Sequence, residues 1–144
     1  MYLVGLTIFI CFLIGSTFLS GSPAYYMDIP SLIIILTFSV PMLMASGLLP
    51  DFLRGFTIMG QKENTFSTIE LKKTREAISL MIKLLLLSGI IGTMIGLLAI
   101  FINPGLKLWP NVAVSLITLV YSLLFAFILF PIKSRVNAIL FTKD

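Results

Sequence analysis

Four long runs of apolar residues, each bounded by polar or charged positions, set the pattern of this chain. A helix needs about 20 apolar residues to cross the ~30 Å hydrocarbon core of a bilayer, and each run is close to that length. The pattern therefore predicts an all-α protein with four membrane-spanning helices. The predicted spans are Tyr2–Leu19, Ile29–Leu49, Leu84–Ile102 (extended backwards through Lys83 to about residue 77) and Leu108–Ile132.

The polar segment 51–76 connects the second and third spans and contains the start of a long helix. Its first part, Pro50–Gly60, mixes proline, glycine and aromatic residues, and we interpret it as a turn or a short interfacial segment. Ser67 and Glu70 have the Ser-x-x-Glu spacing of a capping box, and no glycine or proline follows until Gly89. We therefore expect one helix over Ser67–Ile102, roughly 54 Å long at 1.5 Å per residue, whose first turns project out of the membrane.

Composition narrows the class of protein further. Hydrophobic residues make up 58% of the 144 residues and charged residues only 11%, whereas soluble domains have about 25% charged residues. The chain has no histidine and one cysteine, Cys11, which excludes a disulfide scaffold, a Cys/His metal site and a His-based triad. A net charge of +4 is too small to suggest a nucleic-acid partner. We expect no cofactor, no metal and no enzyme activity, and a single membrane domain over residues 1–144.

The basic residues orient the predicted spans. Connection 20–28 has no lysine or arginine, and the connection after the third span has only Lys107. The positive-inside rule therefore puts both termini and segment 51–76 in the cytoplasm, so that the third and fourth helices project there. The first run lacks a basic leader segment and is long for a signal peptide, so we expect it to remain as a span. The cytoplasmic basic residues are Arg54, Lys62, Lys72, Lys73, Arg75, Lys83, Lys133, Arg135 and Lys143.

No charged residue lies at the middle of any predicted span, whereas proton paths in membranes usually centre on a buried ionisable group. If the chain conducts ions, a partner must supply the carboxylate. Small and hydroxylated residues do form stripes on the third and fourth spans, and they allow two interpretations. Small residues mark close helix packing, or the two stripes together line a narrow polar path. The stripes consist of Ser88, Gly89, Gly92, Thr93, Gly96 and Ala99 on the third span, and Ser115, Thr118, Ser122 and Ala126 on the fourth.

Two further positions, Asp28 and Pro131, complete the candidate residues. Asp28 lies at the outer mouth of the second span, where Pro30 follows it in the first turn of a helix. Pro131 closes the fourth apolar run and is interpreted as a helix terminus or as a movable hinge. The face that carries Gly92 and Gly96 is expected to pack against a neighbouring copy of the chain, because glycines allow two helix backbones to approach closely and contact with lipid does not require this.

Three stretches resemble the MotA/TolQ/ExbB family of proton channels, and most closely MotA, the ion-channel subunit of flagellar stators. Tyr26–Ile34 (YMDIPSLII) is similar to the aromatic-x-Asp-x-Pro-Ser start of that family's second span. Gly89–Leu97 (GIIGTMIGL) is similar to its third-span motif, G-x-I-G-T-x-x-G-L. Ala113–Thr118, followed by Tyr121 and Pro131, resembles its fourth span. The three stretches occur in the family's order and on its four-span topology.

The resemblance implies a function. Members of the family form a ring, a pentamer, around a dimer of a single-span partner (MotB-like, ExbD-like or TolR-like) in the bacterial inner membrane. The partner's aspartate carries an ion past the pore threonines, which Thr93 and Thr118 match, with Ser115 and Ser122 on the same path. Pro131 matches the fourth-span proline on which conformational change depends. The resemblance thus implies a channel subunit of a rotary, force-generating complex powered by the proton motive force.

The chain departs from MotA in three ways. Segment 51–76 stands in place of a large cytoplasmic domain, which leaves open whether the chain contacts a rotor. Leu86 replaces a third-span proline. Leu119 follows Thr118 where sodium-driven members have a second threonine, and the loss of that oxygen favours protons. Two alternatives stay open: a non-conducting membrane scaffold of the same fold, and an energiser of the TolQ/ExbB type rather than a flagellar stator.

Overall fold

The computed structural model describes residues 2–60, 66–103, 105 and 107–143. These residues form helices and no strand, which confirms the all-α class. The elements are α1 (Tyr2–Leu19), the 3₁₀ turn η1 (Pro23–Tyr26), α2 (Ile29–Ala45), α3 (Leu49–Gly60), α4 (Thr68–Ile102) and α5 (Leu108–Lys143). Four segments are long and apolar enough to cross a membrane, as predicted: Tyr2–Leu19, Ala24–Ala45, Thr68–Ile102 and Leu108–Lys143.

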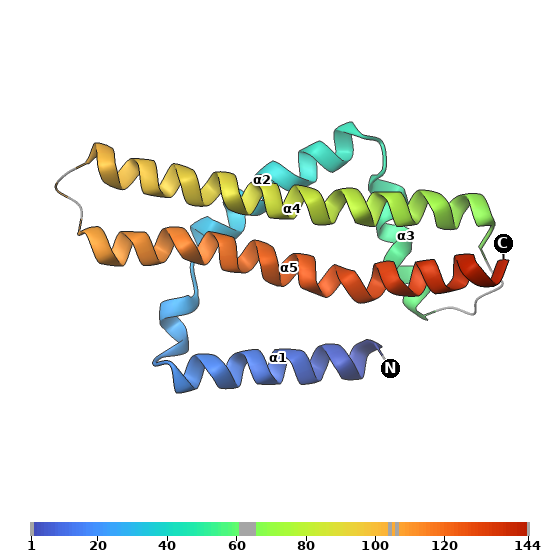
Figure 1. Cartoon of the computed structure of the whole chain (residues 1–144), viewed down its shortest axis with the longest axis horizontal. Coiled ribbons are helices and arrows are strands. Elements are labelled where there is room, and N and C mark those ends of the chain that lie inside the picture. Colours follow the sequence, from blue (N-terminus) through green and yellow to red (C-terminus); the bar gives the residue numbers. More distant parts are fainter. Residues whose placement is uncertain (1, 61–65, 104, 106, 144) are drawn as a thin grey trace.

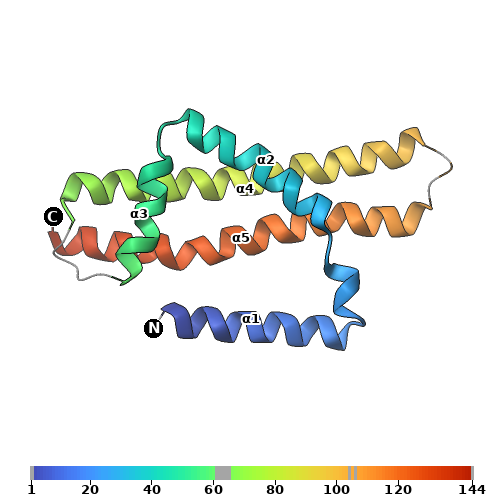
Figure 2. The same cartoon turned by 180° about the vertical axis from the view of Figure 1, so that it is seen from behind.

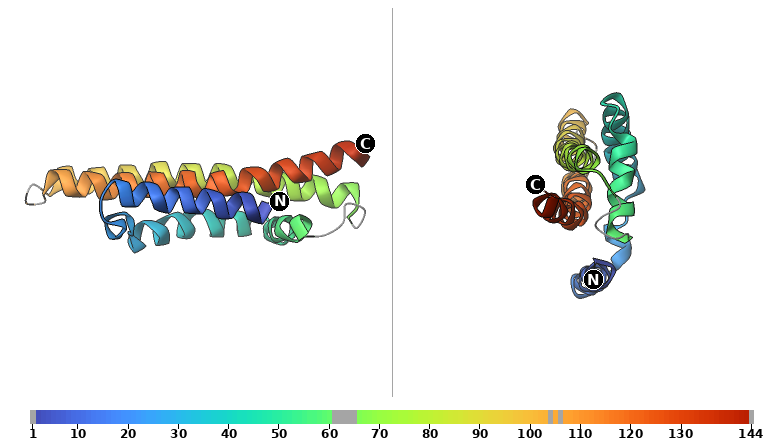
Figure 3. Two further views of the ribbon diagram at one scale, coloured as in Figure 1. Left: turned by 90° about the horizontal axis from the view of Figure 1, so that it is seen from below. Right: turned by 90° about the vertical axis from the view of Figure 1, so that its right-hand side faces the viewer.

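The two longest helices, α4 and α5, form an antiparallel hairpin that runs the length of the molecule (Figure 1). Helix α2 crosses one face of this hairpin, and α3 crosses the same face nearer the end that carries the C-terminus (Figure 2). Seen end-on, α2 and α3 form a second layer beside α4 and α5, with α1 at the margin (Figure 3). The apolar core lies between the two layers and includes Ile35, Ile58, Ile78, Leu85 and Ile132.

The capping box predicted for α4 is present. Ser67 Oγ accepts a hydrogen bond from the Glu70 backbone N–H at 3.2 Å, and a Glu70 carboxylate oxygen accepts one from the Ser67 N–H at 2.8 Å. These bonds from Ser67 favour the ionised carboxylate, so they hold the pKa of Glu70 below its ordinary value. The helix then continues unbroken to Ile102, also as predicted. Residues 61–65 of the preceding connection, Lys62 among them, lie outside the described residues.

Two boundaries differ from the sequence-based expectation. The second span ends at Ala45 rather than Leu49, because the chain turns at Gly47, whose φ of 72° is in the region that favours glycine. The segment interpreted as a turn is instead helix α3. Gly55 of α3 lets it pack closely, since a Cβ there would lie 2.8 Å from the Cδ1 of Ile78 on α4. Leu49 therefore belongs to the start of α3 and Leu48 to the turn before it, and neither belongs to the second span.

Pro131 does not end the fourth helix, because α5 continues through it to Lys143. The interpretation of this proline as a helix terminus was therefore wrong. Proline has no N–H, so the carbonyl of Phe127, four residues earlier, lacks its usual helical hydrogen bond. Helices in membranes tolerate such breaks where neighbouring groups compensate for the lost bond. A hinge at Pro131 stays a prediction.

Helix α1 is held more loosely than the other long helices. None of its 18 described residues is buried. Its contacts with α5 include the stacked rings of Phe9 and Phe127, with centroids 5.1 Å apart. The hydroxyl of Tyr2 also donates a hydrogen bond to the carbonyl of Ile128 at 3.4 Å. Since α1 is apolar on all sides, lipid or other protein must cover most of its surface.

Candidate ion-pathway site

The two predicted stripes of small residues face each other inside the chain. A Cβ added to Gly89 would lie 1.9 Å from Ser122 Oγ, and one added to Gly96 would lie 2.4 Å from Ser115 Oγ. Each glycine of α4 thus makes room for a hydroxyl side chain of α5. The expectation that this face packs against a neighbouring copy was therefore wrong, because α5 of the same chain fills it.

Gly92, between those two positions, makes the same kind of contact with Thr118 and also with α2. A Cβ at Gly92 would lie 2.8 Å from the Thr118 methyl carbon and 3.0 Å from the Cγ2 of Ile34. Three helices therefore meet at Gly92. This three-helix contact includes Thr118, which the family resemblance predicts to be a pore residue.

The predicted pathway hydroxyls are buried and hydrogen-bonded to carbonyls of the hairpin. Thr93 Oγ1 donates across the helix pair to the carbonyl of Ser115 at 3.1 Å. Ser115 Oγ donates to the carbonyl of Asn111 at 2.9 Å, and Ser122 Oγ to that of Leu119 at 2.8 Å. None of Thr93, Ser115 and Ser122 is more than 7% exposed. These hydroxyls therefore lie between the helices and away from the outer surface of the chain.

A polar cluster joins the start of α2 to α5. Ser31 Oγ lies 2.7 Å from Thr118 Oγ1, and the Ser31 hydroxyl also contacts a carboxylate oxygen of Asp28. The same oxygen caps α2 by accepting the Ser31 backbone N–H at 3.0 Å. The hydroxyl of Tyr121 accepts a hydrogen bond from the Asp28 N–H at 3.1 Å and donates one to the carbonyl of Tyr26. A continuous line of hydrogen bonds thus runs from the Asp28 carboxylate to Thr118.

Asp28 lies at the start of α2, as expected, but some way along the hairpin rather than at its end. Its partner Thr118 is ten residues into α5, which is roughly 15 Å at 1.5 Å per residue. Figure 1 shows the hairpin extending well beyond the start of α2. The carboxylate is therefore set back from the closed end of the α4–α5 hairpin.

A second polar link between α2 and α4 lies further along α2, where Ser39 Oγ is 3.0 Å from Ser88 Oγ. Both side chains are fully buried, and Ser88 also donates to the carbonyl of Leu85 at 2.8 Å. Beyond this link, an apolar layer separates the hydroxyls from the end of the hairpin that carries the basic residues. The layer consists of Met81, Leu85, Ala126, Leu129 and Ile132.

Ser31, Ser39 and Tyr121 were not among the predicted pathway residues. Ser31 and Tyr121 stand in the stretches that carry the family resemblance, so a signal for them existed. Ser39 is one serine in an apolar helix, and only its buried contact with Ser88 distinguishes it. Within the described part of the chain, no group of three or more acidic, cysteine or histidine side chains could hold a metal ion.

No protein-family model and no curated protein matches this chain.

Proposed function

We propose that this chain is an ion-channel subunit of the MotA/TolQ/ExbB type, which passes protons together with a single-span partner that supplies the ion-carrying aspartate. The observation that supports this most directly is the line of hydrogen bonds from Asp28 through Ser31 to Thr118. It links the first and third of the three stretches that carry the resemblance, although Ser31 and Thr118 stand 87 residues apart in the sequence.

The hydrogen-bonded groups from Asp28 to Thr118 are suited to the transfer of protons. A hydroxyl both donates and accepts a hydrogen bond, so Ser31 and Thr118 can exchange a proton with a carboxylic acid beside them. An unaccompanied charge faces a prohibitive barrier in hydrocarbon, and the partner's carboxylate removes that barrier by carrying the proton as a neutral acid. Sodium needs several oxygen ligands instead, and Leu119 offers none beside Thr118.

The proposal includes a ring of several copies in the bacterial inner membrane, five by resemblance, around two copies of the partner. Since α5 fills the glycine face of α4, contacts between copies must use other surfaces. Large apolar side chains are exposed on the faces of α4 and α5 that point away from the hydroxyls. These residues are Ile91, Met94, Ile95, Leu98, Leu116, Val120 and Leu123.

A non-conducting scaffold of the same fold is the second candidate, and a specific observation favours it. Thr93 and Ser122 already donate to carbonyls of the chain, and both lie below 8% exposure. To meet a partner's carboxylate, they would have to become accessible through a movement of α4 against α5. If they never do, their role is helix packing.

Proton uptake by proteoliposomes distinguishes the two candidates. The chain alone is expected to take up no more protons than empty liposomes, and co-reconstitution with its single-span partner is expected to produce uptake. Thr118→Val and Thr93→Val keep the side-chain shape and remove the oxygen, so each should reduce uptake with no loss of assembly. Thr7→Val is the matched control, because that exposed hydroxyl donates only to the carbonyl of Leu3 in its own helix, at 2.8 Å. Unchanged uptake in the Thr93/Thr118 double variant would reject the pathway through these threonines and leave them as helix-packing residues. Normal assembly with no uptake in the presence of the partner would favour the scaffold.

A further inference from the structure

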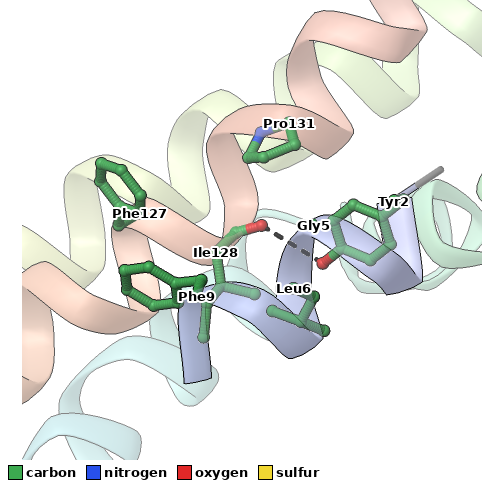
Figure 4. A pocket seen from close by; sticks show the side chains of 7 residues that line it. All are labelled: Tyr2, Gly5, Leu6, Phe9, Phe127, Ile128 and Pro131. Atoms are coloured by element: carbon green, nitrogen blue, oxygen red, sulfur yellow. Dashed lines mark hydrogen bonds between the residues drawn. The ribbon is translucent and has the colours of Figure 1, made fainter. Parts of the chain in front are cut away.

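A pocket of about 260 Å³ lies between α1 and α5 at the level of Pro131 (Figure 4). The stacked rings of Phe9 and Phe127 bound one end of it, and the hydrogen bond from the Tyr2 hydroxyl to the Ile128 carbonyl bounds the other. The wall is apolar, and Gly5 contributes open space because an added Cβ would meet nothing within 4 Å.

The volume and the lining decide what can fill this pocket. A single water molecule requires only about 10–15 Å³, and apolar cavities of larger size stay dry and bind hydrocarbon. A segment of an acyl chain has the shape and the apolar surface to fill such a space. The pocket lies on membrane-spanning helices, so acyl chains surround it.

The sequence of α5 places a positive charge beside the pocket. Arg135 follows Pro131 by four residues, so it lies one turn further along the same face of the helix, and it is exposed. The direction of that turn is toward the end of the hairpin that carries the basic residues, the cytoplasmic end by the positive-inside rule. A guanidinium has five donors and binds phosphate in a bidentate geometry.

We propose that this pocket binds one acyl chain of an anionic phospholipid of the cytoplasmic leaflet, with the lipid phosphate held by Arg135. The lipid then lies against α5 where Pro131 interrupts the helical hydrogen bonds. It fills the gap that the loose contact of α1 leaves. This site is independent of whether the chain conducts protons.

Native mass spectrometry of the purified protein in mild detergent tests the site. Phosphatidylglycerol and phosphatidylcholine with identical acyl chains are added in equal amounts, and the lipids retained per chain are counted. The wild type should retain phosphatidylglycerol over phosphatidylcholine by about fivefold, the effect of one basic residue on an anionic lipid. Arg135→Gln should remove this preference, whereas Lys107→Gln, an exposed basic residue at the opposite end of the α4–α5 hairpin, should keep it.

Gly5→Leu tests the pocket itself. Its side chain should occupy the open space and reduce the retention of both lipids severalfold. Gly15→Leu on the same helix is the control, since its Cβ also meets nothing within 4 Å and it does not line the pocket. The proposal is overturned if Gly5→Leu retains as much lipid as Gly15→Leu, or if the wild type holds both lipids equally. A change of oligomer size in Gly5→Leu with unchanged lipid would instead show that a second copy covers the pocket.

Discussion

Replacing Gly89 with alanine should force α4 and α5 apart. The new Cβ would lie 1.9 Å from Ser122 Oγ and 2.4 Å from Ser122 Cβ. Rotation of the serine side chain can move its Oγ but not its Cβ, which is fixed to the backbone of α5. The clash can therefore be relieved only by a shift of one helix against the other.

The size of the effect follows from two opposing terms. Overpacking of a tight core typically costs about 1–3 kcal/mol, occasionally more, whereas alanine in place of a helical glycine gains about 0.5–1 kcal/mol. The fixed Cβ contact puts Gly89 at the upper end of the first range. We expect Gly89→Ala to lower the free energy of unfolding by about 2 kcal/mol net, measured by denaturation in mild detergent followed by far-UV circular dichroism.

Two other glycines provide matched controls. Gly15 is also helical, but a Cβ there meets nothing within 4 Å, so Gly15→Ala should be neutral or slightly stabilising. Gly55→Ala should cost less than Gly89→Ala, because the nearest atom is the Cδ1 at the flexible end of Ile78, 2.8 Å away. The expected order of stability is thus Gly15→Ala, then Gly55→Ala, then Gly89→Ala.

A double-mutant cycle tests whether the contact with Ser122 causes the loss of stability in Gly89→Ala. Ser122→Gly removes both clashing atoms and leaves the Cα of Leu119, 3.6 Å away, as the nearest contact of the new Cβ. The combination with Gly89→Ala should therefore be more stable than the sum of the single effects by at least about 1 kcal/mol. Additive effects, or a Gly89→Ala variant as stable as Gly15→Ala, would show that α4 and α5 do not pack through this face.

Four further predictions concern single side chains, each measured as the free energy of unfolding in detergent. Ser67→Ala should cost about 1 kcal/mol through loss of the cap. The pKa of Glu70 is lowered in the folded protein, so the stability advantage of the wild type over Glu70→Ala should depend on pH. That advantage should be full above the ordinary pKa of 4.5 and vanish as the pH falls through the lowered value. Thr74→Val should stabilise by about 1 kcal/mol, because the buried Thr74 Oγ1 has no hydrogen-bond partner among the described residues. Tyr121→Phe should destabilise by about 1 kcal/mol, because the Asp28 N–H and the Tyr26 carbonyl both lose their bond to its hydroxyl.

Features encoded by residues close in sequence were predictable. The Ser67–Glu70 box fixes the start of α4 within one turn, so spacing alone located it. The end of α2 was not predictable, because Leu48 and Leu49 are as apolar as the span they follow. Only the positive φ of Gly47 ends the helix, and the sequence pattern does not report that angle. The prediction of a helix end at Pro131 failed for a related reason. Proline commonly breaks helices in water, but α5 continues past it.

The candidate site was predictable as a set of residue types but not as a set of contacts. Spacing identified Gly92 and Thr118 as members of two stripes, since both repeat on one helix face. Which surfaces those stripes meet depends on tertiary packing, and here they meet each other. The link between Ser31 and Thr118 joins positions 87 residues apart, so no local pattern contains it.

Because α2 begins some way along the hairpin, the apolar surface of the protein is shorter on the side of α2 than on the opposite side of the hairpin. The 17 residues of α2 span about 26 Å, whereas the apolar side chains of Leu98, Phe101 and Trp109 remain exposed on the hairpin beyond it. A bilayer that matches the taller side must thin beside the shorter one, at a fraction of a kcal/mol per Å of mismatch. We therefore expect short acyl chains to be favoured beside α2 and longer ones behind the hairpin.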